Sequence, residues 1–283
     1  MSFEMIQGDA RRIPLPDGSV DVVVTSPPYL RQRQYGTDTA NEIGLEETVA
    51  DYVRTIGDVF DELRRVMRPG TSSAWLNLGD KANNSGGAGG DWAQANKAAA
   101  LAGGGPGRFR DSAFPEASYM QVPQLVVAEL MRRGWRLRLP IVWDKGRDSP
   151  ESLQFVRRPR WSHEMIFLLV PWERARRATS PRPKWYPSAL TETGSVWHFP
   201  PGGSGDPHLA PFPDELARRC ILPTTLPGDV VFDPFAGSGT VPRVAHQLGR
   251  RGIGLELYHE RDDLRHGIDT GPRAGRRARE AEG

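Results

Sequence analysis

The chain has 283 residues, of which 38% are hydrophobic and 25% are charged, and its formal net charge at pH 7 is +2. This length allows one large α/β domain with an inserted segment, and so small a net charge does not itself indicate a polyanionic partner. No apolar run approaches the roughly 20 residues of a membrane helix, and the single cysteine excludes an internal disulfide and a cysteine-rich metal site. We therefore expect a cytoplasmic protein with no signal peptide, no membrane segment and no bound metal.

Strand and helix patterns alternate along the chain, which predicts an α/β fold. The expected strands, in chain order, are Phe3–Gln7, Val20–Val24, Ser73–Leu78, Trp135–Trp143, Glu164–Val170, Val230–Phe232 and Gly252–Leu257. The expected helices are Glu46–Met67, Val122–Arg133, Phe212–Leu222 and Val241–Leu248. Residues 83–107 are rich in Gly, Ala and Asn and bury little apolar area, so we expect a mobile loop there, within a wider loop at 83–112.

A short motif follows the buried strand expected at Val20–Val24. Thr25-Ser26-Pro27-Pro28-Tyr29 contains two consecutive prolines, which stop the strand and leave carbonyl groups outside the sheet ladder. In open α/β sheets, ligands bind at the carboxyl ends of the strands. A hydroxyl, fixed carbonyl acceptors and an aromatic ring suit binding of the exocyclic amine of a flat base. The alternative is a strand-ending turn with a packed tyrosine, and Pro-Pro-Tyr alone does not exclude it.

A second motif lies near the other end of the chain, between a predicted strand and a predicted helix. Gly237-Ser238-Gly239 lets the backbone approach a ligand, and the helix that begins at Thr240 offers free N–H groups to an anion. Glu256 ends the next strand, at about the spacing where an acid binds ribose hydroxyls. The motif lacks the full three-glycine pattern, so a simple tight turn between strand and helix remains an alternative.

Taken together, the two motifs resemble those of the DNA amino-methyltransferases. The segment 233–240, Asp-Pro-Phe-Ala-Gly-Ser-Gly-Thr, resembles their S-adenosylmethionine motif, and Thr25-Ser26-Pro27-Pro28-Tyr29 resembles their catalytic motif. The catalytic motif comes first, which is typical of the permuted beta class. Weaker matches are Gly8-Asp9, Trp143-Asp144-Lys145, Ser162-His163-Glu164 and 207–213. The resemblance spans Gly8 to Glu256, and Ser-Pro-Pro-Tyr is typical of the cytosine-N4 enzymes.

This resemblance implies a Rossmann-like fold with a mostly parallel, seven-stranded sheet flanked by helices and a small inserted DNA-recognition segment. Residues 1–170 would form the catalytic half of one methyltransferase domain and residues 208–260 its cofactor-binding half. Residues 171–207, with several prolines and glycines and three tryptophans, are the candidate recognition insertion. Residues 261–283 form a charged tail that we expect to fray.

The resemblance also implies the roles of individual residues. The catalytic residues would be Ser26, Pro27, Pro28 and Tyr29. The residues that bind S-adenosyl-L-methionine would be Asp9, Thr25, His208, Pro211, Phe212, Pro213, Asp233, Pro234, Phe235, Ala236, Gly237, Ser238, Gly239, Thr240 and Glu256.

Binding of double-stranded DNA would depend on basic residues. From Lys145 to Lys184 the chain has ten Lys or Arg against four Asp or Glu, although such a run is often only a solvated face. Phosphate contacts are expected from Arg157, Arg158, Arg160, Arg174, Arg176 and Arg177, and base contacts from residues 171–207 with Arg31 and Arg33. We expect a monomer or homodimer of bacterial, archaeal or phage origin, acting at the nucleoid with or without a cognate restriction endonuclease.

In the expected reaction, Ser26 Oγ and the Pro27 carbonyl accept hydrogen bonds from the amine of a base rotated out of the duplex, and Tyr29 stacks on that base. Cytosine-C5 chemistry is excluded because its nucleophilic cysteine usually follows a proline, whereas Cys220 follows Arg219. Three alternatives remain: adenine-N6 methylation on the same scaffold, methylation of a protein glutamine or an RNA base, and a catalytically inactive DNA-binding protein.

Overall fold

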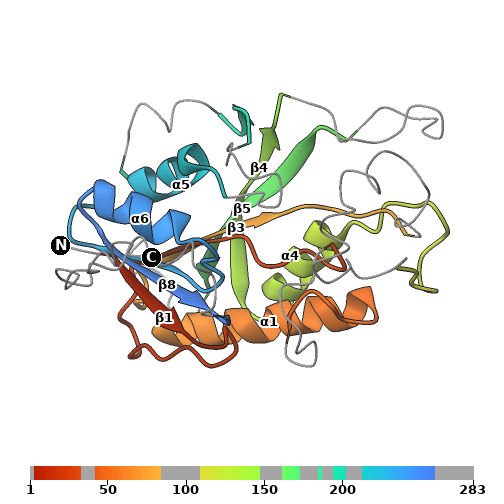
Figure 1. Ribbon diagram of the computed structural model, residues 1–283, viewed down its shortest axis with the longest axis horizontal. Helices are drawn as coiled ribbons and strands as arrows, with labels where there is room; N and C mark the ends of the chain where they lie inside the picture. Colours follow the sequence, from red (N-terminus) through yellow and green to blue (C-terminus); the bar gives the residue numbers. More distant parts are fainter. Residues whose placement is uncertain are drawn as a thin grey trace, which may run out of the picture.

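The computed structural model describes residues 3–32, 42–83, 109–146, 161–172, 184–186, 194–201 and 212–258. Its strands are β1 (Glu4–Gln7), β2 (Val22–Thr25), β3 (Ser73–Leu78), β4 (Trp135–Asp144), β5 (His163–Pro171), β6 (Val196–His198), β7 (Val230–Asp233) and β8 (Arg251–Glu256). Its helices are α1 (Val49–Val66), α4 (Val122–Arg132), α5 (Asp214–Ile221) and α6 (Thr240–Gln247), with a 3-10 turn, η3, at Leu222–Thr224. Figure 1 shows their arrangement. Most of the expected loop at 83–112, most of the 171–207 segment and the 261–283 tail lie outside the described residues.

The strands of the described residues form one sheet in the order β1-β8-β7-β2-β3-β5-β4-β6. The neighbours from β1 to β3 run parallel, β5 runs antiparallel to both β3 and β4, and β6 pairs in parallel with β4. The predicted α/β fold with a mostly parallel sheet is confirmed. Within the described residues the sheet has eight strands rather than the expected seven, because the short β6 forms inside the segment 171–207 that we predicted to be a recognition insertion.

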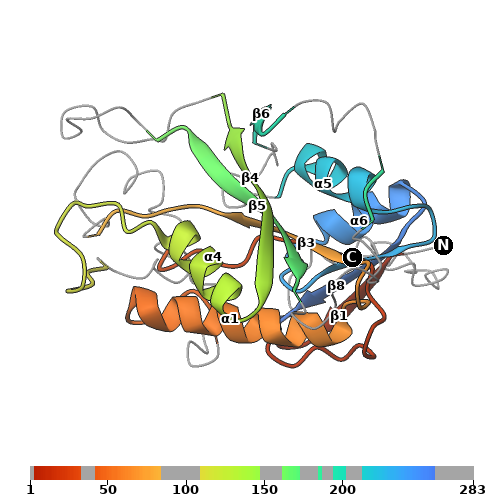
Figure 2. The same ribbon diagram turned by 180° about the vertical axis from the view of Figure 1, so that it is seen from behind.

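The strand sequences explain why the sheet lies in the middle of the molecule. β2, Val-Val-Val-Thr, and all six residues of β3 are buried, as expected for strands covered on both faces. Helices α1 and α4 cover one face and α5 and α6 cover the other, as Figures 1 and 2 show from opposite sides. The result is a three-layer α/β/α arrangement.

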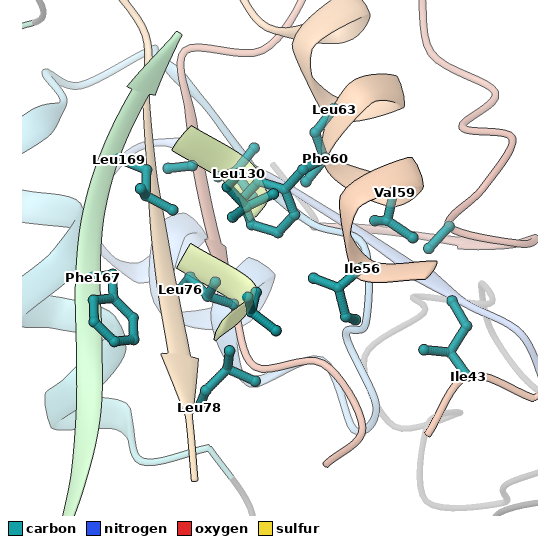
Figure 3. Close-up of a cluster of buried hydrophobic side chains, with 14 of the residues drawn as sticks. Ile43, Ile56, Val59, Phe60, Leu63, Leu76, Leu78, Leu130, Phe167 and Leu169 are labelled. Carbon is teal, nitrogen blue, oxygen red and sulfur yellow. The ribbon is translucent and has the colours of Figure 1, made fainter. Parts of the chain in front are cut away.

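The face under α1 carries the larger apolar core. Figure 3 shows Ile56, Val59, Phe60 and Leu63 of α1 directed toward side chains of the sheet and α4. The sheet and α4 residues that the figure labels in this cluster are Leu76, Leu78, Leu130, Phe167 and Leu169. These α1 positions recur every three or four residues, so the helical period places them on one stripe. This core holds β3 and β5 in place under the candidate site.

Helix α1 begins where Thr48 accepts a hydrogen bond from the backbone N–H of Asp51, a typical N-terminal cap. Helix α4 has a different start, because Asp80, just past β3, accepts hydrogen bonds from the N–H groups of Gln121 and Val122. The end of β3 is thereby tied to α4. No helix in the described parts of the chain is long and apolar enough to cross a bilayer.

Candidate active site

The two predicted motifs lie on neighbouring strands. β2 pairs in parallel with β7, with Val22 opposite Val231 and Val23 opposite Phe232, so the carboxyl ends of both strands meet at one edge of the sheet. At that edge the Thr25 hydroxyl donates a buried hydrogen bond of 2.7 Å to Oδ1 of Asp233. Two residues that are 208 positions apart in the sequence are thus in direct contact. The structure brings the catalytic and cofactor motifs together.

Asp233 is 3% exposed and is the acid that begins the cofactor motif. Its Oδ1 also accepts a hydrogen bond of 3.0 Å from the N–H of Phe235, which shapes the turn after β7. Burial, aided by repulsion from Glu256, raises the pKa of Asp233 to about 7, although the bonds from Thr25 and Phe235 act in the opposite direction. Such a perturbed carboxyl at a strand end is typical of functional sites.

The glycine turn after Asp233 folds against the end of β8. Gly237 and Gly239 have φ angles of +51° and +82°, which non-glycine residues rarely adopt. The Gly237 N–H donates to Oε2 of Glu256 over 2.8 Å, and the Leu257 N–H donates to Oε1 over 3.1 Å. The predicted ribose-binding acid is therefore held beside the glycine turn, with lone pairs left for further hydrogen bonds.

The close packing of this turn depends on a further glycine, on the neighbouring strand. An added Cβ at Gly254 of β8 would lie 2.6 Å from the Cβ of Ala236 and 2.6 Å from Sδ of Met5. Ala236 also donates its N–H to the Leu255 carbonyl over 3.0 Å. A bare backbone at Gly254 therefore lets the turn lie directly on β8. Thr240, buried at 6%, begins α6 immediately after the turn.

Asp9 lies beside Glu256, because β1 pairs with β8 and the Gly8 N–H donates to the Glu256 carbonyl over 2.9 Å. Its carboxylate forms an ion pair with Arg11, with 2.6 Å between Nη2 and Oδ2. Burial opposes ionisation, but the hydrogen bonds and charge of Arg11 lower the pKa of Asp9 overall. The structure thus places Asp9 at the expected edge, where its carboxylate contacts Arg11.

The Ser26-Pro27-Pro28-Tyr29 loop is fixed by contacts from several elements. The Tyr52 hydroxyl, on α1, donates to the Pro28 carbonyl over 2.9 Å, and the Gln32 N–H donates to the Tyr29 carbonyl over 3.2 Å. Pro27 is buried, and Ser26, Pro28 and Tyr29 are half-buried. The loop therefore begins at the Thr25–Asp233 contact and turns over the end of β3.

The Tyr29 ring packs on Gly79, the first residue after β3. An added Cβ at Gly79 would lie 2.7 Å from Cε2 of Tyr29, closer than carbon atoms approach one another. The missing side chain therefore makes room for the ring. Gly79 directly follows the expected strand Ser73–Leu78, and its position in the sequence carries no signal for this contact.

The Tyr29 hydroxyl lies in a polar cluster that the sequence did not predict. It lies 2.8 Å from Oε2 of Glu164, 3.1 Å from Oδ1 of Asn77 and 3.3 Å from the Ser26 hydroxyl. Lys145 forms an ion pair of 3.0 Å with Oε1 of Glu164. Burial and then the nearby Glu164 charge raise the pKa of Tyr29 well above its usual value. The sequence identifies Lys145 and Glu164 only as parts of family-like segments, and it gives no sign of Asn77.

Arg31 follows the loop with a φ angle of +49°. Its Nε donates to the Glu46 carbonyl over 2.9 Å, and its own carbonyl accepts a hydrogen bond of 2.6 Å from Nζ of Lys81. Burial, followed by repulsion from Arg31, lowers the pKa of Lys81 to about 8. These contacts fix the backbone next to the catalytic loop, and the predicted contact of Arg31 with DNA remains a prediction.

Phe212 and Pro213 precede α5, with Pro213 buried and Phe212 packed against the core shared by α5 and α6. Other predicted site residues lie outside the described residues, namely His208, Pro211, Arg33, Arg157, Arg158, Arg160, Arg174, Arg176 and Arg177. Within the described parts of the chain, no group of three or more His, Cys, Asp or Glu side chains is arranged to hold a metal ion. Cys220, also described, is buried in the core of α5.

Comparisons with known proteins show the family to which this fold and this pair of motifs belong. The family model N6_N4_Mtase, DNA methylase, matches residues 20–264. The type II methyltransferase M.Cfr9I of Citrobacter freundii is 34% identical over 92% of this chain and 85% of its own length. The type II methyltransferase M.SmaI of Serratia marcescens is 34% identical over 92% of this chain and 88% of its own length. The chain belongs to the N6_N4 DNA methylase family.

Solved structures share the fold. The putative DNA modification methylase TTHA0409 of Thermus thermophilus, in complex with S-adenosyl-L-methionine, superposes with a TM-score of 0.61 at 25% identity and covers 93% of this chain and 90% of its own. The PvuII DNA methyltransferase, described as cytosine-N4-specific, superposes with a TM-score of 0.63 at 17% identity and covers 92% of this chain and 83% of its own. The predicted membership in the DNA amino-methyltransferases and the Rossmann-like fold are both confirmed.

Proposed function

We propose that this chain transfers a methyl group from S-adenosyl-L-methionine to the N4 exocyclic amine of a cytosine rotated out of duplex DNA. The observation that carries the proposal is the 2.7 Å hydrogen bond between Thr25 and Asp233, which joins the catalytic and cofactor motifs at one edge of the sheet. Methyl transfer needs donor and acceptor sites side by side, because positioning supplies much of the rate.

The methyl donor of this family is S-adenosyl-L-methionine, with which the similar Thermus thermophilus protein was solved. When bound, it supplies a methyl group activated by a sulfonium. The residues around the glycine turn fit such a ligand: Gly237 and Gly239 adopt positive φ angles that form a tight turn, and nothing lies within 4 Å of a Cβ added at Gly237. Glu256 would bind ribose hydroxyls, and Asp233 would lie near the methionine part.

The chain's own residues would prepare the amine for attack. The lone pair of an exocyclic amine is delocalised into the ring, so the amine is a poor nucleophile. Hydrogen bonds from its two N–H groups to Ser26 Oγ and the Pro27 carbonyl would localise that lone pair toward the methyl donor. The Pro28 carbonyl is not assigned this role, because it accepts a hydrogen bond from the Tyr52 hydroxyl. Tyr29, packed on Gly79, would stack on the base and hold it out of the duplex.

The choice of cytosine over adenine is supported by Ser26, because the family resemblance associates Ser-Pro-Pro-Tyr with N4 chemistry and Asp- or Asn-Pro-Pro-Tyr with N6 chemistry. The matched family includes DNA methylases of both kinds, so adenine N6 is the alternative substrate.

The partner would be double-stranded DNA, bound through the arginines predicted above. The type II names of M.Cfr9I and M.SmaI support a restriction-modification role with a cognate endonuclease. The orphan methyltransferase M.BamHII of Bacillus amyloliquefaciens is 27% identical, and its name supports a role without a cognate endonuclease.

The experiment follows tritium from labelled S-adenosylmethionine into duplex DNA, with the wild-type chain and Ser26→Ala. We expect the wild type to label DNA and Ser26→Ala to lower turnover by about 100-fold or more, because one aligned hydrogen-bonding group is lost. Cofactor binding, measured by calorimetry, should be unchanged, since Ser26 lies outside the glycine turn. Equal turnover by both proteins, or no transfer to DNA by the wild type, would contradict the proposal.

A further inference from the structure

Glu164 of β5 accepts hydrogen bonds from three side chains at the edge of the sheet where the catalytic loop lies. Its Oε2 accepts from the Tyr29 hydroxyl over 2.8 Å and from Nδ2 of Asn77 over 3.2 Å, and its Oε1 accepts from Nζ of Lys145 over 3.0 Å. Asn77 lies on β3, and Lys145 directly follows β4. β5 runs between these two strands, so Glu164 is held from both sides.

The chemistry of these groups fixes the direction of the hydrogen bonds. A carboxylate only accepts, so the single proton of the Tyr29 hydroxyl is directed at Glu164, with the Asn77 carbonyl oxygen as a longer second acceptor at 3.1 Å. Asn77 cannot reverse this arrangement, because its amide N–H groups donate to Glu164 and to the Met165 carbonyl. The Tyr29 oxygen is then an acceptor, and the Ser26 hydroxyl donates to it over 3.3 Å.

We propose that Glu164 is a positioning residue that acts through Tyr29 to direct the Ser26 proton away from the substrate, so that Ser26 presents a lone pair to the target amine. This inference rests on the proposed function and extends it to residues outside the catalytic motif. Lys145 and Asn77 hold the Glu164 carboxylate in place. The direction matters because a Ser26 proton aimed at the amine nitrogen would bind the lone pair that must attack.

The same arrangement favours a substrate of a particular class. A base with an amine at this position donates to Ser26, whereas a base with a carbonyl there would face the lone pairs of Ser26 and the Pro27 carbonyl. Leaving such acceptors unpaired in a buried site is costly. The hydrogen bonds that connect Glu164 through Tyr29 to Ser26 would therefore help the enzyme to accept cytosine and to reject thymine, which carries a carbonyl in place of the amine.

A double-mutant cycle tests the inference with four proteins: wild type, Tyr29→Phe, Glu164→Gln and the double variant. Single-turnover rates are measured at saturating DNA and S-adenosylmethionine. We expect each single variant to lose about 10- to 100-fold in rate, the value of a hydrogen bond to a charged group. Because both changes break the same series of hydrogen bonds, the rate of the double variant should be close to that of the slower single variant. Cofactor affinity should be unchanged in all four.

Glu129→Gln on α4 is the matched control. Its side chain is 17% exposed and ion-paired, compared with 16% for the Glu164 side chain, but it contacts Arg132 and Arg133 rather than the catalytic loop. This variant should keep the wild-type rate. If Glu164→Gln does not fold, Tyr29→Phe still tests the inference, because it removes one hydroxyl and no charge and an unchanged rate in this variant would overturn the inference.

The inference is overturned if the losses of Tyr29→Phe and Glu164→Gln multiply in the double variant, because Glu164 would then act by another route. It is equally overturned if Tyr29→Phe or Glu164→Gln retains the wild-type rate. In each of these cases the wild type still methylates DNA and the proposed function stands. A wild type that transfers no methyl group to DNA would instead overturn the proposed function, and the inference with it.

Discussion

At the scale of single residues, Asp233 combines a structural and a functional role. It is almost fully buried, accepts hydrogen bonds from Thr25 and Phe235, and lies near the charge of Glu256. Burying a carboxylate is expensive, and here the cost is only partly offset by the two donors. A buried acid whose desolvation is only partly offset is typical of a residue retained for binding rather than for stability.

The raised pKa of Asp233 has a measurable consequence for stability. The unfolded chain loses this proton near pH 3.8, whereas the folded chain retains it up to about pH 7. Between these values the unfolded state binds fewer protons, so this group lowers the free energy of unfolding as the pH rises, by on the order of a few kcal/mol. Above pH 7 its contribution is constant. The Asp233→Asn variant lacks this dependence.

We therefore expect Asp233→Asn to gain stability relative to the wild type as the pH rises from 4 to 7. Urea unfolding at several pH values measures the difference. The unpaired amide N–H groups add a constant cost, so the change of the difference with pH is the diagnostic quantity. Parallel stability curves for the two proteins would show that Asp233 ionises in the folded chain as it does in the unfolded one.

At the scale of elements, the pairing of β2 with β7 positions the whole site. These strands come from opposite ends of the sequence, and the Thr25–Asp233 hydrogen bond lies at their common carboxyl edge. Without that bond the two motifs would still share a sheet, but the start of the catalytic loop would lose its tie to the cofactor turn.

Thr25→Val tests this link, because valine has the shape of threonine without its hydroxyl. We expect a loss of about 1–3 kcal/mol in the free energy of unfolding, since a buried acid loses a donor, together with weaker cofactor binding. Thr25→Ser keeps the hydroxyl and loses one buried methyl group, which costs about 1 kcal/mol. Thr25→Ser should bind cofactor like the wild type, and equal cofactor affinity in Thr25→Val and Thr25→Ser would count against the link.

Hydrophobic patterning predicted the large elements well. The expected helix Glu46–Met67 corresponds to α1, Val49–Val66, and the expected strand Ser73–Leu78 has the observed bounds of β3. β6 was missed because it is three residues long and only Trp197 among them is buried, which leaves no alternation to detect. Local patterns thus suffice for elements that bury a long stripe or a full strand.

In the candidate site, too, local motifs predicted some residues, and contacts that depend on the tertiary fold were missed. Thr25 and Asp233 were predicted because their motifs resemble those of the family, and Glu256 also because of its spacing from the glycine turn; the structure brings all three to one edge of the sheet. The contacts of Tyr29 with Asn77 and Glu164 were not predicted, since they depend on β5 lying next to β3. Strand order in a sheet is a property of the tertiary fold, and spacing along the chain does not reveal it.

At the scale of the whole molecule, strands from the two ends of the chain share one sheet, with β8 and β7 lying between β1 and β2. β1 and β2 of the first half pair with β8 and β7 of the last part. Although the two motifs lie far apart in the sequence, the glycine turn and the catalytic loop therefore meet at one edge of the sheet. We propose on this basis that residues 1–170 and 208–260 act as one catalytic unit, to whose sheet β6 of the 171–207 segment adds a strand, and that the rest of this segment serves DNA recognition.

We propose that this single edge of the sheet methylates the exocyclic amine of cytosine in DNA. The most direct measurement is mass spectrometry of nucleosides from duplex DNA incubated with the protein and S-adenosylmethionine. We predict N4-methylcytosine with the wild type and a strongly reduced yield with Ser26→Ala. A product consisting of N6-methyladenine would contradict the choice of base, and the absence of any methylated nucleoside would contradict the account as a whole.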